Sequence, residues 1–400
     1  MAFLSDKLGK IKPSPGLELT RKVTEMKAAG KDVIGLGVGE SNFETPDHIK
    51  EAGIKAIRDG KTRYTTVDGT IECKRAVALK FKRDNNLDFS TNQISVNSGV
   101  KQTIYNALVA TLNPGDEVLI PAPYWMSYPD MTLLAGGVPK LVETSIETGF
   151  KLQPADLDAA ITSKTKWLIF NSPCNPTGAA YTLEELKGLA EVLNKHRHVY
   201  VMCDDIYEHI IYNDFKFKTL LNAAPELADR VLTMNGVAKA YAMTGWRIGF
   251  AGGPEALIKA MSKVQSQSTS NPCTISQEAT VVALTGPQDF LKIRAADFQN
   301  RRDKVLSMLG QVRGISCNRP EGAFYIYADC RDLIGKKTPA GQVLASDTDI
   351  AKYFLESKGV AVIQGEVFGL SPYFRLSYAA SMDVLEDACG RLQEASADLT

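Results

Sequence analysis

Short apolar segments, each followed by a turn of polar or glycine residues, recur along the middle of this chain. The segments have the length of buried strands, and helical patterns lie between several of them. They cover residues 94–97, 118–121, 167–170, 199–203 and 231–234. Strands that alternate with helices predict an α/β fold with a mostly parallel sheet. Because ligands bind beyond the carboxyl ends of such strands, the residues of these turns are the first candidates for a functional site.

Length and charge narrow the class of protein. The chain has 400 residues, more than one hydrophobic core comfortably serves, so we expect two domains. Basic and acidic residues number 46 each, so nothing indicates a nucleic-acid partner or an acidic membrane surface. No apolar run is long enough to cross a bilayer. The expected partner is a small molecule.

The cysteines and the N-terminal residues bear on the compartment. The 7 cysteines stand singly, without a C-x-x-C pair, so neither a disulfide framework nor a metal site is predicted. The first residues lack the apolar stretch of a secretory signal, and no arginine precedes Arg21. We therefore expect reduced thiols and a cytoplasmic protein.

The turn after segment 94–97 has the features of an anion site. Ser98 and Gly99 interrupt the strand, and a helix follows from about Val100. A helix N-terminus offers free backbone N–H groups and the positive end of a dipole, which suit a phosphate. The spacing of a Walker loop is absent. An ordinary strand-to-helix turn is therefore the alternative interpretation.

Trp125 and Asn175 occupy the next two turns. Trp125 follows segment 118–121 in a turn that contains proline, where it is either a surface plug or a platform for a flat ring. Asn175 follows segment 167–170, and the prolines and glycine around it predict a rigid turn that fixes its direction.

Two carboxylates and a phenol follow segment 199–203, in Asp204, Asp205 and Tyr207. A carboxylate buried at the end of a strand needs a cationic partner. Taken alone, Asp204 and Asp205 could equally be a solvated pair in a turn. Their position in the series of strand ends makes them candidates for the same site.

Lys239 follows segment 231–234 and lies between Ala238 and Ala240, and Arg247 stands eight positions further on. With no acidic neighbour in sequence, Lys239 can be partly desolvated, which lowers the pKa of its amine and makes it a usable nucleophile and base. Schiff-base chemistry needs such an amine. For a lone lysine, a solvated loop residue is the common alternative.

The motifs SGVKQ, PYW, NPTG, DDIY, AKAYAMTGWRIG and FRLSY occur in this order, and together they resemble the pyridoxal-phosphate aminotransferases of the aspartate aminotransferase superfamily, in particular its bacterial branch. The resemblance implies the fold type I architecture: a large cofactor-binding domain over 47–300 with a mainly parallel seven-stranded sheet flanked by helices. It implies a smaller α+β domain from 13–46 and 301–400, and an N-terminal arm over 1–12. It also implies a homodimer with shared active sites.

The resemblance assigns roles to the candidate residues. Lys239 resembles the lysine that forms the Schiff base with pyridoxal 5′-phosphate, and Asp204 resembles the carboxylate that keeps the pyridine nitrogen protonated. Asn175 and Tyr207 resemble the pair that hydrogen-bonds to the phenolic oxygen of the cofactor. Trp125 resembles the residue that stacks on its ring.

The same resemblance implies where the anionic groups bind. The family's phosphate contacts fall on Gly99, Val100, Lys101 and Arg247, with Tyr64 resembling a tyrosine that reaches the phosphate from the other subunit. The substrate α-carboxylate is expected at Arg375 and the Gly39 backbone, beside Trp125 and Asn175.

Some positions depart from the family pattern. Ala238 stands where relatives often have serine, and Gly16 stands where a hydroxyl residue is common. Ser41 and Asn42 lie in a segment that usually reads G-E-P-D-F. These departures leave the expected catalysis intact and affect the expected substrate.

The predicted activity is a ping-pong aminotransferase of amino-acid metabolism that uses L-aspartate and 2-oxoglutarate as its best amino acid and 2-oxo acid. Lys12 and Ser14 are the candidates for the substrate's second carboxylate, and Lys101 is a further candidate if its side chain turns away from the phosphate. A lysine contact is less bidentate than an arginine contact, so aromatic amino acids or prephenate are expected as further substrates. The alternatives are an aromatic, prephenate or neutral amino-acid aminotransferase, a β-eliminating lyase of the same fold and, more remotely, a non-catalytic binding protein.

Overall fold

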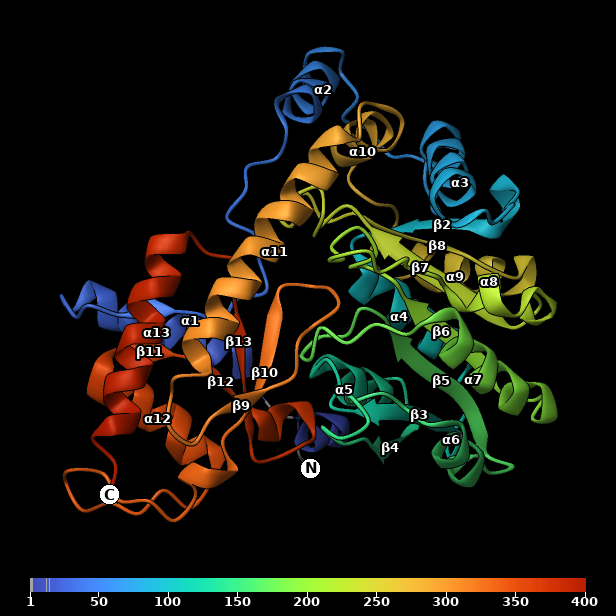
Figure 1. The fold of residues 1–400 in the computed structure, drawn as a ribbon. Helices are drawn as coiled ribbons and strands as arrows, with labels where there is room; N and C mark the ends of the chain where they lie inside the picture. Colours follow the sequence, from blue (N-terminus) through green and yellow to red (C-terminus); the bar gives the residue numbers. More distant parts are fainter. Residues whose placement is uncertain (1–2, 12, 14) are drawn as a thin grey trace.

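The computed structural model describes residues 3–11, 13 and 15–400, and it contains a large and a small sheet with helices around them (Figure 1). The large sheet has 7 strands in the order β2-β8-β7-β6-β5-β3-β4. Their bounds are β2 Ile94–Asn97, β3 Glu117–Ala122, β4 Val138–Glu143, β5 Thr165–Asn171, β6 Tyr200–Asp204, β7 Val231–Gly236 and β8 Gly249–Gly252. Neighbours pair in parallel except at β8, which is antiparallel to β2 and β7. The predicted mainly parallel α/β sheet is confirmed.

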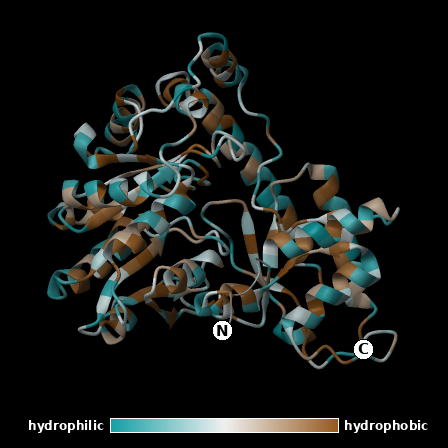
Figure 2. Cartoon of the chain, turned by 180° about the vertical axis from the view of Figure 1, so that it is seen from behind, coloured by the Kyte–Doolittle hydropathy of each residue, from teal (hydrophilic) through white to brown (hydrophobic). Residues whose placement is uncertain are grey.

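Alternate side chains of the central strands enter two different hydrophobic cores, because successive side chains of a strand point to opposite faces. In β5, Trp167 and Ile169 pack on one face, whereas Leu168 and Phe170 pack on the other. The first face is covered by α4 Val100–Thr111, α5 Ser127–Leu134 and α9 Glu255–Ser266, and the second by α3 Ile71–Asn85, α6 Pro154–Ala160, α7 Leu183–Lys195 and α8 Leu220–Ala223. Hydrophobic residues accordingly dominate the strands of this sheet in Figure 2.

The strand directions bring the predicted turns to one edge of the sheet. The carboxyl ends of β2, β3, β5, β6 and β7 lie together because these strands run the same way. β8 runs in the opposite direction and therefore begins at this edge. Arg247, two residues before β8, thus reaches the same edge as Lys239, which follows β7.

The small sheet is antiparallel, with the order β12-β13-β10-β9. Its strands are β9 Ser316–Cys317, β10 Tyr325–Asp329, β12 Ile363–Gln364 and β13 Tyr373–Ser377, and beside it β1 Ile34–Gly35 pairs in parallel with β11 Val360–Ala361. The helices of this part are α1 Pro15–Ala28, α12 Asp347–Lys358 and α13 Met382–Ala397. Helix α11, Asp289–Leu309, extends from beside α10 into this part (Figure 1). The exact domain boundaries given above stay a prediction.

The remaining helices complete the chain. Helices α2 Asp47–Arg58 and α10 Thr274–Thr285 pack against each other at the top of Figure 1. Short 3-10 helices cover Asp6–Lys10, Thr91–Gln93, Pro225–Leu227, Arg331–Leu333 and Gly365–Phe368. Within the described part of the chain, no helix has the length and apolar character needed to cross a membrane.

Candidate active site

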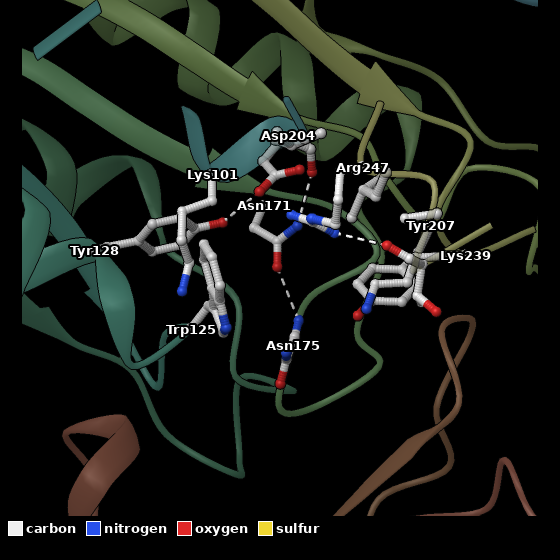
Figure 3. A pocket seen from close by; sticks show the side chains of 14 residues that line it. Lys101, Trp125, Tyr128, Asn171, Asn175, Asp204, Tyr207, Lys239 and Arg247 are labelled. Atoms are coloured by element: carbon white, nitrogen blue, oxygen red, sulfur yellow. Dashed lines mark hydrogen bonds between the residues drawn. The ribbon is translucent and has the colours of Figure 1, made fainter. Parts of the chain in front are cut away.

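A cavity of about 250 Å³ at the carboxyl edge of the large sheet gathers most of the predicted site residues (Figure 3). The predicted residues that line it are Gly99, Val100, Lys101, Trp125, Asn175, Asp204, Tyr207, Lys239 and Arg247. Two others adjoin it through hydrogen bonds. Lys239 donates to the Gly39 carbonyl, and Arg375 donates to Asn175.

Lys239 has the environment that its sequence context predicted. Its side chain is half-buried, and Nζ donates to the Gly39 carbonyl oxygen at 2.6 Å. Burial, followed by the positive charge of Arg375, lowers the pKa of Lys239 to about 8. The amine is therefore a far stronger nucleophile at neutral pH than a solvated lysine.

Asp204 ends β6 with one satisfied and one unsatisfied oxygen. The residue is only 4% exposed, and Oδ2 accepts from the Tyr128 hydroxyl at 2.8 Å. Oδ1 has no hydrogen-bond partner among residues 3–11, 13 and 15–400. Burial raises the pKa of Asp204 to about 6, against the lowering effect of the Tyr128 hydrogen bond. A cationic N–H donor at Oδ1 would offset the cost of this buried carboxylate.

Asp205, the other carboxylate of the predicted pair, has a different surrounding. It is also buried, but it does not line the cavity. Burial raises its pKa well above the usual value. The structure therefore separates two residues that the turn pattern alone left equivalent.

Arg375, on β13, is a buried cation that forms no ion pair among the described residues. It is 3% exposed, and its Nη1 donates to Asn175 Oδ1 at 2.8 Å. Its Nη2 donates to the Gly37 carbonyl, whereas its Nε has no hydrogen-bond partner within the part of the chain that the structure describes. A carboxylate bound here would supply both a charge and the missing acceptor.

Glycines open the end of the cavity near Arg247. Gly99, the N-cap of α4, has a φ of 88°, and a Cβ on it would lie 2.5 Å from Arg247 Nη2. A Cβ on Gly249 would lie 2.2 Å from the backbone nitrogen of Val100. Side chains at these positions would displace the arginine and the first turn of α4. The glycines thus leave the helix N-terminus and the guanidinium facing a common space that fits an anion.

Lys101 and Trp125 form one wall of the cavity (Figure 3). Lys101 Nζ lies 4.7 Å from the centroid of the Trp125 ring, a cation–π contact. Burial, followed by the charge of Arg247, lowers the pKa of Lys101. Two neighbouring cations without a carboxylate between them favour an anionic ligand.

Three predicted residues lie outside the cavity or outside the described residues. Tyr64 is 90% exposed and lines a separate surface hollow. Lys12 and Ser14, the candidates from the N-terminal segment, lie outside the described residues. Of the departures from the family pattern, Ala238 does line the cavity.

Three residues that the sequence did not single out hold the predicted ones in place. Tyr128 hydrogen-bonds to Asp204; its spacing of three residues from Trp125, one helical turn, was the available signal. Asn171 donates to the Asp204 carbonyl at 2.7 Å and accepts from the Asn175 amide at 2.8 Å. Tyr325, from the small sheet, lies 2.8 Å from the Tyr207 hydroxyl, and no local sequence signal marks it.

Asp84, Glu208 and His209 lie close enough together to hold a metal ion. However, Lys80 forms an ion pair with Glu208, and Arg83 forms one with Asp84 at 2.6 Å. These cations already neutralise both carboxylates. The cluster is therefore a network of ion pairs.

Known proteins resemble this chain over its whole length. A family model described as aminotransferase class I and II matches residues 31–392. An aspartate/prephenate aminotransferase of Cereibacter sphaeroides is 57% identical over 400 residues, which cover 100% of both chains. An aspartate aminotransferase of Rhizobium meliloti is 50% identical over 391 residues, 98% of this chain and 95% of that protein.

Solved structures agree with these sequence relatives. The crystal structure of the aspartate aminotransferase from Rhizobium meliloti has a TM-score of 0.97 at 49% identity and covers 100% of each chain. The aspartate aminotransferase from Thermus thermophilus with maleate has a TM-score of 0.92 at 40% identity, covering 99% of this chain and 100% of that one. The chain therefore belongs to the class I and II aminotransferase family and has its fold type I architecture.

Proposed function

We propose that this aminotransferase binds pyridoxal 5′-phosphate in the cavity at the edge of the large sheet. The observation that carries the proposal is a pair of buried groups that find no hydrogen-bond partner in the described part of the chain, Asp204 Oδ1 and Arg375 Nε. A protonated pyridine nitrogen would satisfy the first group, and the α-carboxylate of an amino acid would satisfy the second. When bound, this cofactor supplies an aldehyde that reacts with amines and a ring that accepts the electron pair left at the substrate α-carbon.

The other cavity residues suit the remaining parts of the cofactor. The N-terminus of α4, at Gly99 and Val100, and the guanidinium of Arg247 would hold the phosphate. Trp125 would lie against the ring. Tyr207, together with Asn175, would hydrogen-bond to the phenolic oxygen.

Lys239 Nζ would act as both the covalent anchor and the proton carrier. With a pKa of about 8, roughly one molecule in ten has a neutral amine at pH 7. Once the substrate amine has replaced Lys239 as the group bonded to the cofactor, Nζ would accept the proton from the substrate α-carbon. The Gly39 carbonyl, 2.6 Å from Nζ, would keep the free amine within the site.

Reductive labelling tests this proposal. We expect pyridoxal phosphate, added to cofactor-free protein and reduced with borohydride, to modify one peptide, the one that contains Lys239. The rate of attachment should rise with pH around a midpoint near 8, because only the neutral amine reacts and burial lowers the pKa of Lys239 to about 8. Lys101, which lines the same cavity, is the internal control. Labelling spread over surface lysines, with a midpoint near 10, would contradict the proposal.

For the substrate, we propose L-aspartate with 2-oxoglutarate as the best pair and prephenate or aromatic amino acids as further substrates. Arg375 accounts for the α-carboxylate. A second carboxylate needs another cation, and Lys101 lines the cavity with its Nζ along the face of Trp125. The relatives named aspartate/prephenate aminotransferase support this range. A flexible lysine is less selective than a bidentate arginine, and Trp125 gives an aromatic side chain a surface to pack on.

Steady-state kinetics with a panel of substrates test the range. We expect kcat/KM for aspartate to exceed that for alanine by about tenfold or more, since one charged contact gives roughly 1.5–3 kcal/mol. Lys101→Ala should lower kcat/KM for aspartate more than for phenylalanine. A preference for alanine over aspartate would refute the acidic pocket and leave the assignment of Lys239 intact.

We further propose a cytoplasmic homodimer with shared active sites. Tyr64 projects from the surface and lines a hollow. Ile275 lines both this hollow and a second one, so the two hollows adjoin. Ile54 and Ile57 of α2 expose apolar surface beside them. An exposed apolar region of this kind suits an interface between two copies of the chain. The unpaired cysteines are consistent with a reducing compartment.

Subunit exchange tests the shared site. Tyr64→Ala and Lys239→Ala proteins should each be poorly active as homodimers. After exchange, each hybrid dimer would hold one intact site, so an equal mixture should recover about a quarter of normal activity. No recovery, although mass spectrometry shows that subunits have exchanged, would count against a shared site.

A further inference from the structure

Tyr325 lies between two functional side chains that come from distant parts of the chain. It begins β10 and is fully buried. Its hydroxyl lies 2.8 Å from the hydroxyl of Tyr207, in the turn after β6. The face of its ring lies 4.5 Å from the guanidinium carbon of Arg375, on β13. One side chain therefore contacts both a cavity residue and the cation proposed to bind the substrate.

The surrounding packing holds the Tyr325 hydroxyl in place. A Cβ on Gly39 would lie 2.5 Å from this hydroxyl, so the backbone of the segment that also accepts from Lys239 closes over it. The Tyr207 and Tyr325 rings meet edge to face, with centroids 5.8 Å apart. The hydrogen bond between the two hydroxyls is thus set by a close-packed environment on both sides.

The role proposed for Tyr207 determines which hydroxyl donates. A phenol has one proton to give and can also accept. The two hydroxyls lie 2.8 Å apart, and by geometry either one can be the donor. If Tyr207 gives its proton to the phenolic oxygen of the cofactor, as proposed above, only Tyr325 has a proton for the bond between the two hydroxyls. Tyr325 therefore donates to Tyr207.

We propose that Tyr325 is a positioning residue, which donates to the Tyr207 hydroxyl and thereby directs the Tyr207 proton to the phenolic oxygen of the bound cofactor. This inference rests on the cofactor site proposed above. A proton directed there stabilises the deprotonated phenolic oxygen. Loss of the Tyr325 hydroxyl should therefore raise the apparent pKa of the bound cofactor.

The test is a pH titration of the visible absorbance of the cofactor-bound protein, which reads this ionisation without reference to turnover. Tyr325→Phe keeps the ring beneath Arg375 and removes only the hydroxyl. We expect the apparent pKa of the absorbance change to rise by about 0.5 to 1, as loss of one neutral hydrogen bond predicts. Binding of maleate should stay within about twofold of normal, since the ring contact with Arg375 remains.

A double-mutant cycle separates positioning from general disturbance of the fold. Tyr207→Phe alone should also raise the apparent pKa, and adding Tyr325→Phe to it should cause no further change. Tyr378→Phe is the matched control. This variant removes a buried hydroxyl that donates to the Tyr212 hydroxyl at 3.1 Å, outside the cavity. It should therefore leave the titration unchanged.

Three outcomes would overturn the inference. If Tyr325→Phe leaves the apparent pKa unchanged, the positioning role is refuted. The same holds if Tyr325→Phe shifts the apparent pKa equally in the Tyr207→Phe background. Absence of a cofactor absorbance band in the unmodified protein would instead overturn the proposed cofactor site, and this inference with it.

Discussion

Lys239→Ala is expected to lose turnover almost completely, with kcat/KM lower by about 10⁴-fold, because one substitution removes both the proton carrier and the covalent anchor. Among the described residues, Lys101 is the only other lysine that lines the cavity, and it forms no hydrogen bond to the Gly39 carbonyl that would let it replace Lys239. The groups that would hold the phosphate remain. Pyridoxal phosphate should therefore still bind, which equilibrium dialysis can measure beside the steady-state rates.

Lys101→Ala is the control for this variant. Lys101 lines the same cavity, and its pKa is also lowered by burial, but its Nζ lies over Trp125 and not at Gly39. We expect kcat on a neutral substrate to change by less than about tenfold, because no proton is carried by this amine. Near-normal turnover of Lys239→Ala, or an equal loss in Lys101→Ala, would refute the assignment of Lys239.

Asp204→Asn is expected to slow removal of the substrate α-proton by about 10³-fold, the size of effect seen when one charge-stabilising group is removed from an active site. The amide has the same shape and can still accept from the Tyr128 hydroxyl, so the local structure should persist. What it lacks is the charge that would keep the pyridine nitrogen protonated. Exchange of the substrate α-hydrogen with deuterated water, followed by NMR, measures this step directly.

Asp205→Asn provides the matched comparison one position away. Burial raises the pKa of Asp205 well above its usual value, which favours the neutral carboxyl that an amide resembles. It also does not line the cavity. We expect nearly normal exchange in this variant. If Asp205→Asn slowed exchange and Asp204→Asn did not, the carboxylate would be assigned to the wrong residue.

The sequence alone was sufficient for the fold class and for the residues of the strand ends. Short apolar strands alternating with helices predict a parallel sheet, and parallel strands place their carboxyl ends at one edge. Gly99, Trp125, Asn175, Asp204 and Lys239 accordingly line one cavity. The sequence also predicted a lowered pKa for Lys239, although its causes, burial and the charge of Arg375, come from the tertiary structure.

The contacts between distant segments were decided by tertiary structure. Arg375 and Asn175 are 200 positions apart, and only the packing of the small sheet against the large one brings them to 2.8 Å. The same packing joins Tyr325 to Tyr207 and leaves Asp204 Oδ1 and Arg375 Nε without partners. Tyr64 shows the reverse case: the family resemblance assigned it to the site, and the fold of this chain leaves it on the surface. Local patterns report hydrophobic periodicity and turn chemistry; whether a buried polar atom finds a partner depends on residues that local patterns do not connect.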